Sequence, residues 1–235
     1  LKERIFFREY LNPLIFWYGV MHKKKSLFVT FEGVEGSGKS YQSKKLYKKI
    51  VKMGLKAILT REPGGTTSAE KIREVILKDY FNPQFKEKFD KYTDTLLYLA
   101  SRNEHIENKI KPAILKKKII ICDRFIDSTL AYQVYGKGVN KKLIDGIHKV
   151  ILKNIKPDIT FVLKLNINKA LQRIKKRKSR NRYDNYTKKF YQKVQNAFVK
   201  IAKSNKRKYI VLDTTKDTKD TEKVIFNKFV NILKK

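Results

Sequence analysis

The apolar positions of this chain form two alternating kinds of pattern. Short runs that are rich in β-branched and aromatic residues, with polar turns at their ends, predict strands. Such runs lie at residues 26–31, 55–60, 118–122, 159–165 and 208–213. The run at 118–122 is too apolar to face water on either side, which predicts an interior strand of a parallel sheet.

Between these runs, apolar residues recur at helical spacing. Leu46, Ile50 and Met53 share one face of a helix predicted over 41–53, and Gly54 ends that helix. Further helices are predicted at 68–78, from Thr93 or Asp94 to 109, from Pro112, at 126–135, at 140–153, from a cap at Asn168, at 187–204 and at 221–233. Thr67 and Glu70 form a capping box for the helix at 68–78. In the helix at 221–233, Ile225, Phe229 and Ile232 face inward.

The alternation of strands and helices predicts an α/β fold. Its five-stranded parallel sheet is covered by helices on both faces, and ligands bind at the carboxyl ends of the strands. The chain has 235 residues and no internal repeat, so we expect a single domain over residues 21–235. No apolar run approaches the length that spans a bilayer, so we expect no membrane partner.

Residues 1–20 differ in composition from the rest of the chain, because they crowd aromatic side chains around a proline. They lack the basic start, uninterrupted apolar segment and cleavage site of a signal peptide. We interpret this N-terminal extension as translation assigned too far upstream, with Met21 as the natural start. A peripheral anchor or a packing arm is the alternative.

The few cysteines and histidines exclude some kinds of chemistry. Cys122 is the only cysteine, so no disulfide can form within the chain, and its place in an apolar run predicts burial. This composition fits a reducing cytoplasm. The histidines, His22, His105 and His148, have no metal-ligand spacing, and we expect them at the surface or at a pocket edge.

The net charge of +34 is the strongest feature of the composition. It favours anionic ligands and raises the alternative of nucleic-acid binding. However, the lysines are spread along the chain, no nucleic-acid module is present, and the abundance of Lys, Ile, Asn, Tyr and Phe is typical of AT-rich coding. We therefore expect no specific nucleic-acid partner.

The stretch "FEGVEGSGKS" fits a phosphate-binding loop between a predicted strand and a predicted helix. Its glycines let backbone N–H groups turn toward phosphate oxygens, and the following helix directs its positive end at the same charge. Lys39 would reach the terminal phosphates of a nucleoside triphosphate, and Ser40 would bind magnesium. An ordinary glycine-rich turn is the alternative. The predicted ATP-binding residues are Gly33, Val34, Glu35, Gly36, Ser37, Gly38, Lys39 and Ser40.

Asp123 and Arg124 follow the interior strand directly. A carboxylate at that point would hold the magnesium shell directly or through water, and the arginine could bind a second phosphate with two N–H groups. A surface ion pair is the alternative, but the phosphate loop favours a role in the site.

Four motifs occur in order along the chain: "FEGVEGSGKS", "TREPGGT", "DRFIDSTLAYQ" and "RNRYD". Together they resemble the thymidylate kinase family of the bacterial type, from about Leu27 to the C-terminus. The resemblance implies a P-loop NTPase fold with a basic lid, transfer of the ATP γ-phosphate to dTMP with Mg²⁺, and a homodimer. It also implies a set of dTMP-binding residues, which are Glu35, Arg61, Tyr98, Arg102, Arg124, Ser128, Thr129, Tyr132 and Gln133.

The family pattern assigns roles to several of these residues. Tyr98, where phenylalanine is commoner, would stack on thymine, and Arg102 one helical turn later would bond the edge of the base. Thr129 is expected near thymine N3, and Tyr132 would exclude a ribose hydroxyl. Glu35 resembles the carboxylate that holds the sugar hydroxyl. Both tyrosines could instead be core aromatics.

The catalytic residues implied are Lys39, Arg124 and two arginines of the basic lid, at about 173–184. The phosphate loop itself contains no basic residue between Gly33 and Gly38, so the lid must supply the cation that stabilises the transition state. The candidates are Arg173, Arg177, Arg180 and Arg182, of which we favour Arg177 and Arg182 from the family's lid spacing.

Two other functions remain open from the sequence. One is another deoxynucleotide or deoxynucleoside kinase. The other is a P-loop nucleotide-binding protein whose basic surface binds RNA or DNA.

Overall fold

The computed structural model describes residues 26–77, 88–176, 182, 186–216 and 218–233. They contain a sheet of five parallel strands in the order β2-β3-β1-β4-β5. The strands are β1 (Leu27–Glu32), β2 (Ala57–Arg61), β3 (Ile119–Asp123), β4 (Ile159–Lys164) and β5 (Tyr209–Asp213). The predicted strands and their parallel arrangement are confirmed, and β3 is an interior strand that lies between β2 and β1.

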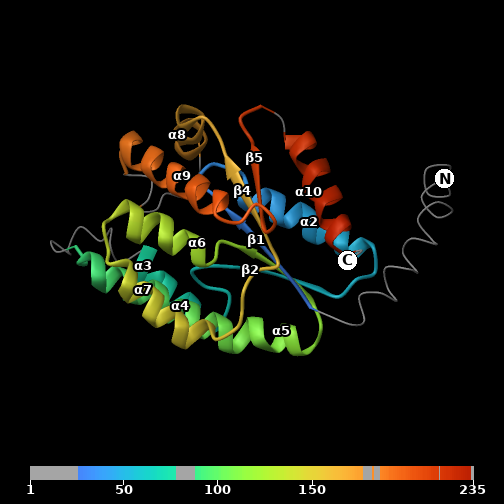
Figure 1. Cartoon of the computed structure of the whole chain (residues 1–235), viewed down its shortest axis with the longest axis horizontal. Helices are drawn as coiled ribbons and strands as arrows, with labels where there is room; N and C mark the ends of the chain where they lie inside the picture. The colour runs from blue at the N-terminus through green and yellow to red at the C-terminus, as the bar shows by residue number, and fades with distance from the viewer. Residues whose placement is uncertain (1–25, 78–87, 177–181, 183–185, 217, 234–235) are drawn as a thin grey trace.

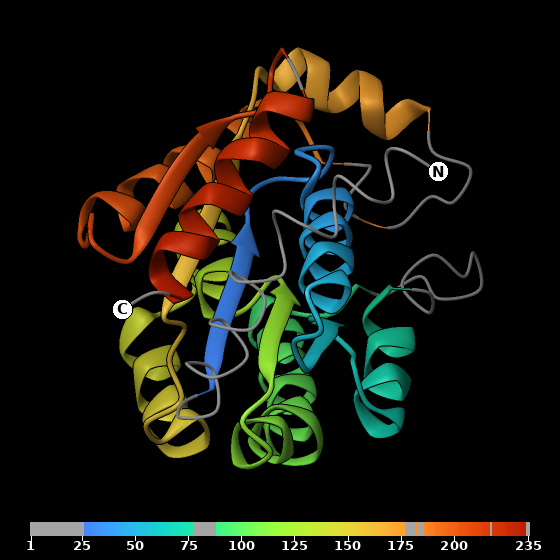
Figure 2. The same ribbon diagram turned by 90° about the vertical axis from the view of Figure 1, so that its right-hand side faces the viewer.

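Helices connect the strands and cover both faces of the sheet (Figure 1). The helical elements are α2 (Lys39–Lys52), α3 (Thr67–Leu77), α4 (Lys91–His105), η2 (Ile106–Ile110), α5 (Lys111–Leu115), α6 (Ile126–Thr129), η3 (Leu130–Gly136), α7 (Lys141–Leu152), α8 (Ile167–Lys175), α9 (Lys188–Lys203) and α10 (Thr218–Leu233). Figures 1 and 2 show α2 and α10 together on one side of the sheet, while α4, α5 and α7 lie on the other.

The core lies on both faces of the sheet because successive strand residues point in opposite directions. Val29 of β1 belongs to the cluster that contains Ile50 of α2 and Phe229 of α10. Its neighbour Phe28 belongs to the cluster on the opposite face, with Ile110 of η2. These residues are at most 3% exposed, so the sheet is buried on both sides and its carboxyl ends are fixed relative to one another.

The caps of α4 and α8 lie earlier in the chain than the sequence predicted. The cap of α4 is Asp90, whose side chain accepts a hydrogen bond from a first-turn backbone N–H, and not Thr93 or Asp94. The cap of α8 is Asn166 rather than Asn168. Several Asp, Asn and Thr residues near a helix start can serve as its cap, and the position at which the chain turns decides among them.

The predicted capping box of α3 is wrong by one residue. The cap is Thr66, whose Oγ1 accepts a hydrogen bond from N of Ala69 at 3.2 Å. Glu70 instead accepts a hydrogen bond from N of Gly65 at 2.9 Å and forms an ion pair with Arg61. The carboxylate of Glu70 therefore ties the start of α3 to the end of β2.

Two of the predicted helices contain π-helical segments. The helix predicted to run to residue 109 is α-helical to His105 and continues as η2, and the helix predicted at 126–135 divides into α6 and η3. Such segments occur frequently at functional sites. Here η3 carries Tyr132 and Gln133, both of which line the cavity described below.

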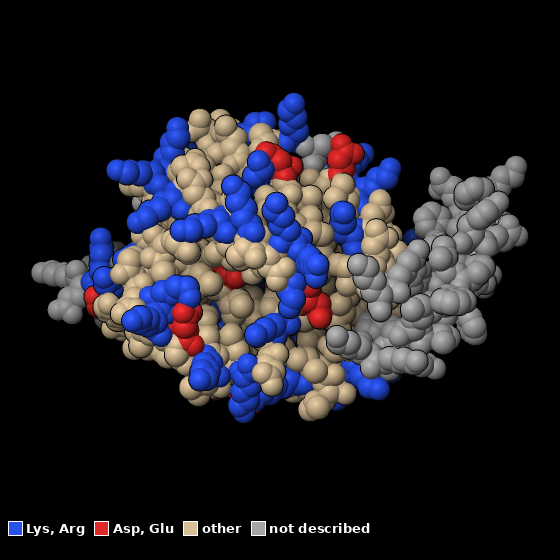
Figure 3. All heavy atoms as spheres, viewed as in Figure 1, with Lys and Arg blue, Asp and Glu red and all other residues tan. Residues whose placement is uncertain are grey.

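Basic side chains are spread over the visible face of the molecule in Figure 3 rather than gathered in one stripe. Within the described ranges, no helix is long and apolar enough to cross a membrane. Residues 1–20 and the lid positions Arg177 and Arg180 lie outside the described part of the chain.

Candidate functional site

The loop between β1 and α2 has the backbone conformation that phosphate binding requires. Gly38 caps α2 with φ 93°, a left-handed conformation that favours glycine. A side chain at Gly33 would collide with the backbone carbonyl of Leu163, so this position also excludes larger residues. The N-terminus of α2 thus faces the loop with its free N–H groups and positive dipole end.

Lys39 is buried beneath this loop and donates hydrogen bonds to the carbonyl oxygen of Val34 at 2.7 Å and to Oγ of Ser37 at 3.4 Å. Burial and the nearby charge of Arg124 lower the pKa of Lys39 to about 7. A buried ammonium group with so few acceptors is prepared to receive an anion, because an anion would stabilise its charged form.

The residues predicted to bind a metal fit a hydrated magnesium ion. Oγ of Ser40 donates a hydrogen bond to Oδ2 of Asp123, which joins the start of α2 to the end of β3. The other carboxylate oxygen of Asp123, Oδ1, is buried and has no hydrogen-bond partner among the described residues. A hydroxyl beside a buried carboxylate oxygen without a partner is the donor set that Mg²⁺ uses together with water.

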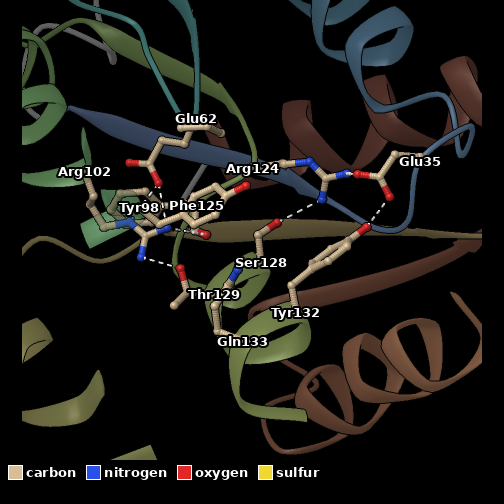
Figure 4. A pocket seen from close by; sticks show the side chains of 11 residues that line it. Glu35, Glu62, Tyr98, Arg102, Arg124, Phe125, Ser128, Thr129, Tyr132 and Gln133 are labelled. Carbon is tan, nitrogen blue, oxygen red and sulfur yellow. Dashed lines mark hydrogen bonds and ion pairs between the residues drawn. The ribbon is translucent and has the colours of Figure 1, made fainter. Parts of the chain in front are cut away.

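A cavity opens beside the loop at the carboxyl ends of β1, β2 and β3 (Figure 4). Every residue expected at the dTMP site except Arg61 lines this cavity. The lining residues are Glu35, Glu62, Pro63, Tyr98, Arg102, Arg124, Phe125, Ser128, Thr129, Tyr132 and Gln133. Sequence reasoning missed Glu62, Pro63 and Phe125, although all three stand inside the quoted motifs.

Arg124 links this cavity to the phosphate loop. Its NH2 lies 2.7 Å from Oε1 of Glu35, and its NH1 donates to Gly33 O and Ser128 Oγ, both at 3.0 Å. Tyr132 donates its hydroxyl hydrogen to the other oxygen of Glu35 (Figure 4). Burial opposes the ionisation of Glu35, but Arg124 and Lys39 outweigh it and hold the pKa of the carboxyl below its usual range.

Glu32, at the end of β1, holds the segment after β3 in place. Its carboxylate accepts hydrogen bonds from N of Phe125 at 2.7 Å and from Oγ of Ser128 at 2.6 Å. Arg124 precedes these residues and has φ 72°, an uncommon conformation for a residue with a side chain. We did not predict this role, although Glu32 stands in the "FEGVEGSGKS" motif.

Arg102 is the centre of a buried polar network at the inner end of the cavity (Figure 4). Its Nε donates to Oε2 of Glu62 at 2.7 Å, and its NH2 donates to the carbonyl oxygen of Phe125 at 2.9 Å. Its NH1 lies 2.8 Å from both Oγ1 of Thr129 and Nε2 of His148. Each nitrogen of the guanidinium therefore already meets a protein acceptor.

The expectation that the histidines lie at the surface or at a pocket edge is wrong for the two in the described ranges. His105 is completely buried, with Nδ1 3.0 Å from Glu62 and Nε2 2.6 Å from Oγ1 of Thr60. His148 is 8% exposed and contacts Arg102. Neither belongs to a group of potential metal ligands within the described residues. A single sequence gives no sign of these polar partners, which come from different elements.

Arg61 is not among the residues that line this cavity. It lines the adjoining cavity on the side of Lys39 and Asp123, together with Arg73 of α3. Glu70 holds Arg61 through two hydrogen bonds, at 3.0 and 3.1 Å, and its Oε2 lies 3.9 Å from Nε of Arg73. Sequence reasoning missed Arg73, although its position on the helix after "TREPGGT" was a usable signal.

The lid arginines that the structure describes have protein partners. Arg173 of α8 donates to the carbonyl oxygens of Gly36 at 3.0 Å and Thr214 at 3.2 Å, which ties α8 to the phosphate loop. Arg182 is 4% exposed and forms an ion pair with Asp94 of α4. Its NH2 also lies 3.1 Å from the hydroxyl of Tyr98. These contacts place Arg182 against α4.

The family model described as thymidylate kinase matches residues 31–225. A thymidylate kinase of Wolbachia pipientis subsp. Culex pipiens is 41% identical over 89% of this chain and 96% of its own. One from Mycoplasma capricolum is 35% identical over 88% of this chain and 94% of its own. The crystal structure of thymidylate kinase from Ehrlichia chaffeensis superposes with a TM-score of 0.67 at 33% identity, over 87% of this chain and 98% of that one.

Proposed function

The chain belongs to the thymidylate kinase family and phosphorylates dTMP to dTDP, a step of dTTP synthesis. From this premise, we propose that the cavity around Arg102 and Arg124 holds dTMP and that the phosphate loop holds ATP. The observation that carries the proposal is the ion pair between Arg124 and Glu35. It joins a residue of the acceptor cavity to a residue of the phosphate loop. We therefore expect the phosphate of dTMP and the γ-phosphate of ATP to lie next to this ion pair.

For the acceptor, the ring of Tyr98 and the guanidinium of Arg102 support binding of the thymine base. Tyr98 is 9% exposed in a cavity wall, and Arg102 lies at the inner end of the same cavity. Tyr132 would close against the sugar and leave no room for a ribose hydroxyl. Arg124 would bind the acceptor phosphate, and Arg61 and Arg73 of the adjoining cavity would add positive charge on its far side.

For the donor, the N–H groups of the loop and Lys39 would hold the phosphates of ATP. Ser40 and Asp123 would hold Mg²⁺, which neutralises charge on the phosphates when it is bound. An oxygen of the dTMP phosphate forms a bond to the γ-phosphorus as the bond to the β–γ bridging oxygen breaks, so that dTDP and ADP leave.

The transition state requires a further cation, which we assign to the lid. Arg177 is the first candidate. Arg182 would fill the role only if its guanidinium exchanged Asp94 for a phosphate oxygen, since the structure pairs it with that carboxylate. Arg173 is already bonded to two backbone carbonyls and fits better as a support for the phosphate loop.

The resemblance also supports a homodimer that acts in the cytoplasm without a specific nucleic-acid partner. Light scattering of the purified chain tests the dimer.

The assignment of the acceptor is tested with ATP, Mg²⁺ and a panel of monophosphates. Turnover of dTMP well above that of dUMP, dGMP and ribothymidine monophosphate is expected. Equal turnover of the ribose and deoxyribose forms would contradict the role given to Tyr132.

A further inference from the structure

Both hydrogens of NH1 of Arg102 are taken by protein acceptors. A guanidinium NH₂ group has two hydrogens and no lone pair to share. One hydrogen goes to Oγ1 of Thr129 and the other to Nε2 of His148, each at 2.8 Å. A substrate oxygen that bonds to NH1 must therefore replace or share one of these partners.

His148 is held in one chemical state by this contact. Because Arg102 can only donate, Nε2 of His148 must be the acceptor, and the ring proton must be on Nδ1. Burial and the charge of Arg102 lower the pKa of His148 to about 3. Glu62 and Asp145 favour the imidazolium and Lys141 opposes it, but burial and Arg102 outweigh them. The imidazole stays neutral throughout the working pH range.

The two acceptors differ in their access to the cavity. Thr129 lines it, whereas His148, on α7, does not. A base in the cavity can thus replace the hydroxyl of Thr129 at NH1, while His148 remains as a fixed acceptor behind it. Arg102 offers only N–H donors to the cavity, and such donors attract a carbonyl oxygen on the base and repel an exocyclic amino group.

We propose that His148 is a positioning residue which, by holding NH1 of Arg102, sets the preference of the cavity for a pyrimidine with oxygen rather than an amino group at position 4. The inference rests on the proposed binding of the base by Arg102. His148 touches no substrate atom and acts only through the direction of the guanidinium. Nothing in the motifs that carry the family resemblance includes this histidine.

The test uses the full chain with His148→Ala, which removes the acceptor, and His148→Gln, which keeps one. Ile144→Val serves as the matched control, because Ile144 is completely buried on the same helix and its change loosens the packing while the hydrogen bonds of Arg102 keep their partners. Thermal unfolding establishes that each variant is folded. Steady-state kinetics give kcat and KM for dTMP, and inhibition of dTMP turnover gives the Ki of dCMP.

We expect His148→Ala to raise the KM for dTMP about tenfold with kcat within about twofold, since one hydrogen bond that orients Arg102 is lost. The ratio of the dCMP Ki to the dTMP KM should fall by at least about tenfold. His148→Gln should recover most of both changes, and Ile144→Val should show neither. Long-range ¹H–¹⁵N spectra should show wild-type His148 as the Nδ1–H tautomer without titration between about pH 5 and 8.

Other outcomes distinguish a failure of the positioning role of His148 from a failure of base binding by Arg102. An unchanged ratio in His148→Ala, equal losses in Ile144→Val, or a histidine that titrates near its usual pKa would overturn the role of His148. If Arg102→Lys also left the KM for dTMP unchanged, the base-binding role of Arg102 would fail instead. A large effect at Arg102 with none at His148 would reject only the positioning role.

Discussion

NH2 of Arg124 lies 2.7 Å from Oε1 of Glu35, so the arginine that follows β3 is held by a carboxylate of the phosphate loop. Both side chains are at least 85% buried, and the pair therefore interacts in a medium of low dielectric. The guanidinium already points toward the loop before any substrate binds. This preorganisation reduces the cost of aligning acceptor and donor phosphates.

Glu35→Gln should weaken this alignment. Arg124 would lose its ionic partner while the shape of the side chain at 35 stays the same, and we expect the kcat/KM for dTMP to fall by about ten- to a hundredfold. Steady-state kinetics measure the effect. Glu107→Gln is the control, because Glu107 pairs with Lys111 at the surface and does not line either cavity beside the phosphate loop. Wild-type kinetics in Glu35→Gln would show that Arg124 needs no such partner.

The low pKa of Lys39 should appear in the pH dependence of stability. Its folded pKa of about 7 lies below the usual 10.5, so the unfolded chain binds more protons between these values and stability rises with pH across that window. Lys39→Met removes the buried amine and should be more stable than wild type at pH 7, with an advantage that shrinks by pH 9. Melting temperatures of both proteins at these pH values test this, and a constant difference would contradict the shifted pKa.

Asp94 neutralises two cations in the interior. Its carboxylate pairs with Arg182 and lies 2.6 Å from Nζ of Lys137, and its side chain is 1% exposed. Asp94→Asn should lower the free energy of unfolding by about 3 kcal/mol, since it leaves buried charge without its partner. Denaturant unfolding measures the change.

The matched control for this experiment is Asp145→Asn. Asp145 also pairs with a lysine, Lys141, but that pair is exposed at the surface of α7. The loss of this ion pair should lower the free energy of unfolding by no more than about 0.5 kcal/mol. If the two variants were equally stable, the network around Asp94 would not contribute as a buried ion pair.

Asp123→Asn should raise the magnesium concentration for half-maximal activity about tenfold, because one ligand oxygen would lose its charge. Ser40→Ala should act in the same direction, since its hydroxyl is bonded to Asp123. Titration of MgCl₂ at saturating ATP and dTMP measures the requirement. Asp213→Asn, at an exposed ion pair with Lys164, is the control, and a similar shift in it would point to a general charge effect.

Arg177→Ala should lower kcat by about ten- to a hundredfold with little change in the KM for dTMP, because its contact would form only in the transition state. Lys178→Ala should have a small effect, since lysine lacks the planar fork of arginine. Equal, small losses in both would mean that the lid only attracts anions. Rapid-quench measurements of the chemical step distinguish a slow transfer from a slow product release.

Arg182→Ala should behave differently from Arg177→Ala. The loss of its contacts with Asp94 and Tyr98 should reduce stability and raise the KM for dTMP, because Tyr98 lines the proposed base site. A pure kcat effect in Arg182→Ala with unchanged melting temperature would restore Arg182 as a transition-state cation and contradict the pairing seen in the structure.

The order of elements, the parallel sheet and the phosphate loop were determined by the sequence alone. Each depends on local pattern: apolar runs such as 118–122 must be buried on both faces, and the glycines of the loop permit backbone angles that other residues disfavour. The family motifs likewise identified most of the residues that line the cavity, because each motif is contiguous in the chain.

Only the tertiary structure decided which partners these residues have. The sequence placed the caps of α3, α4 and α8 wrongly, since several neighbouring residues can cap a helix and packing selects one. It placed His148 at the surface or at a pocket edge, and it gave no sign of the ion pair between Arg182 and Asp94. These contacts join residues far apart in the chain, and their energy depends on burial, which a linear pattern of residue types does not contain.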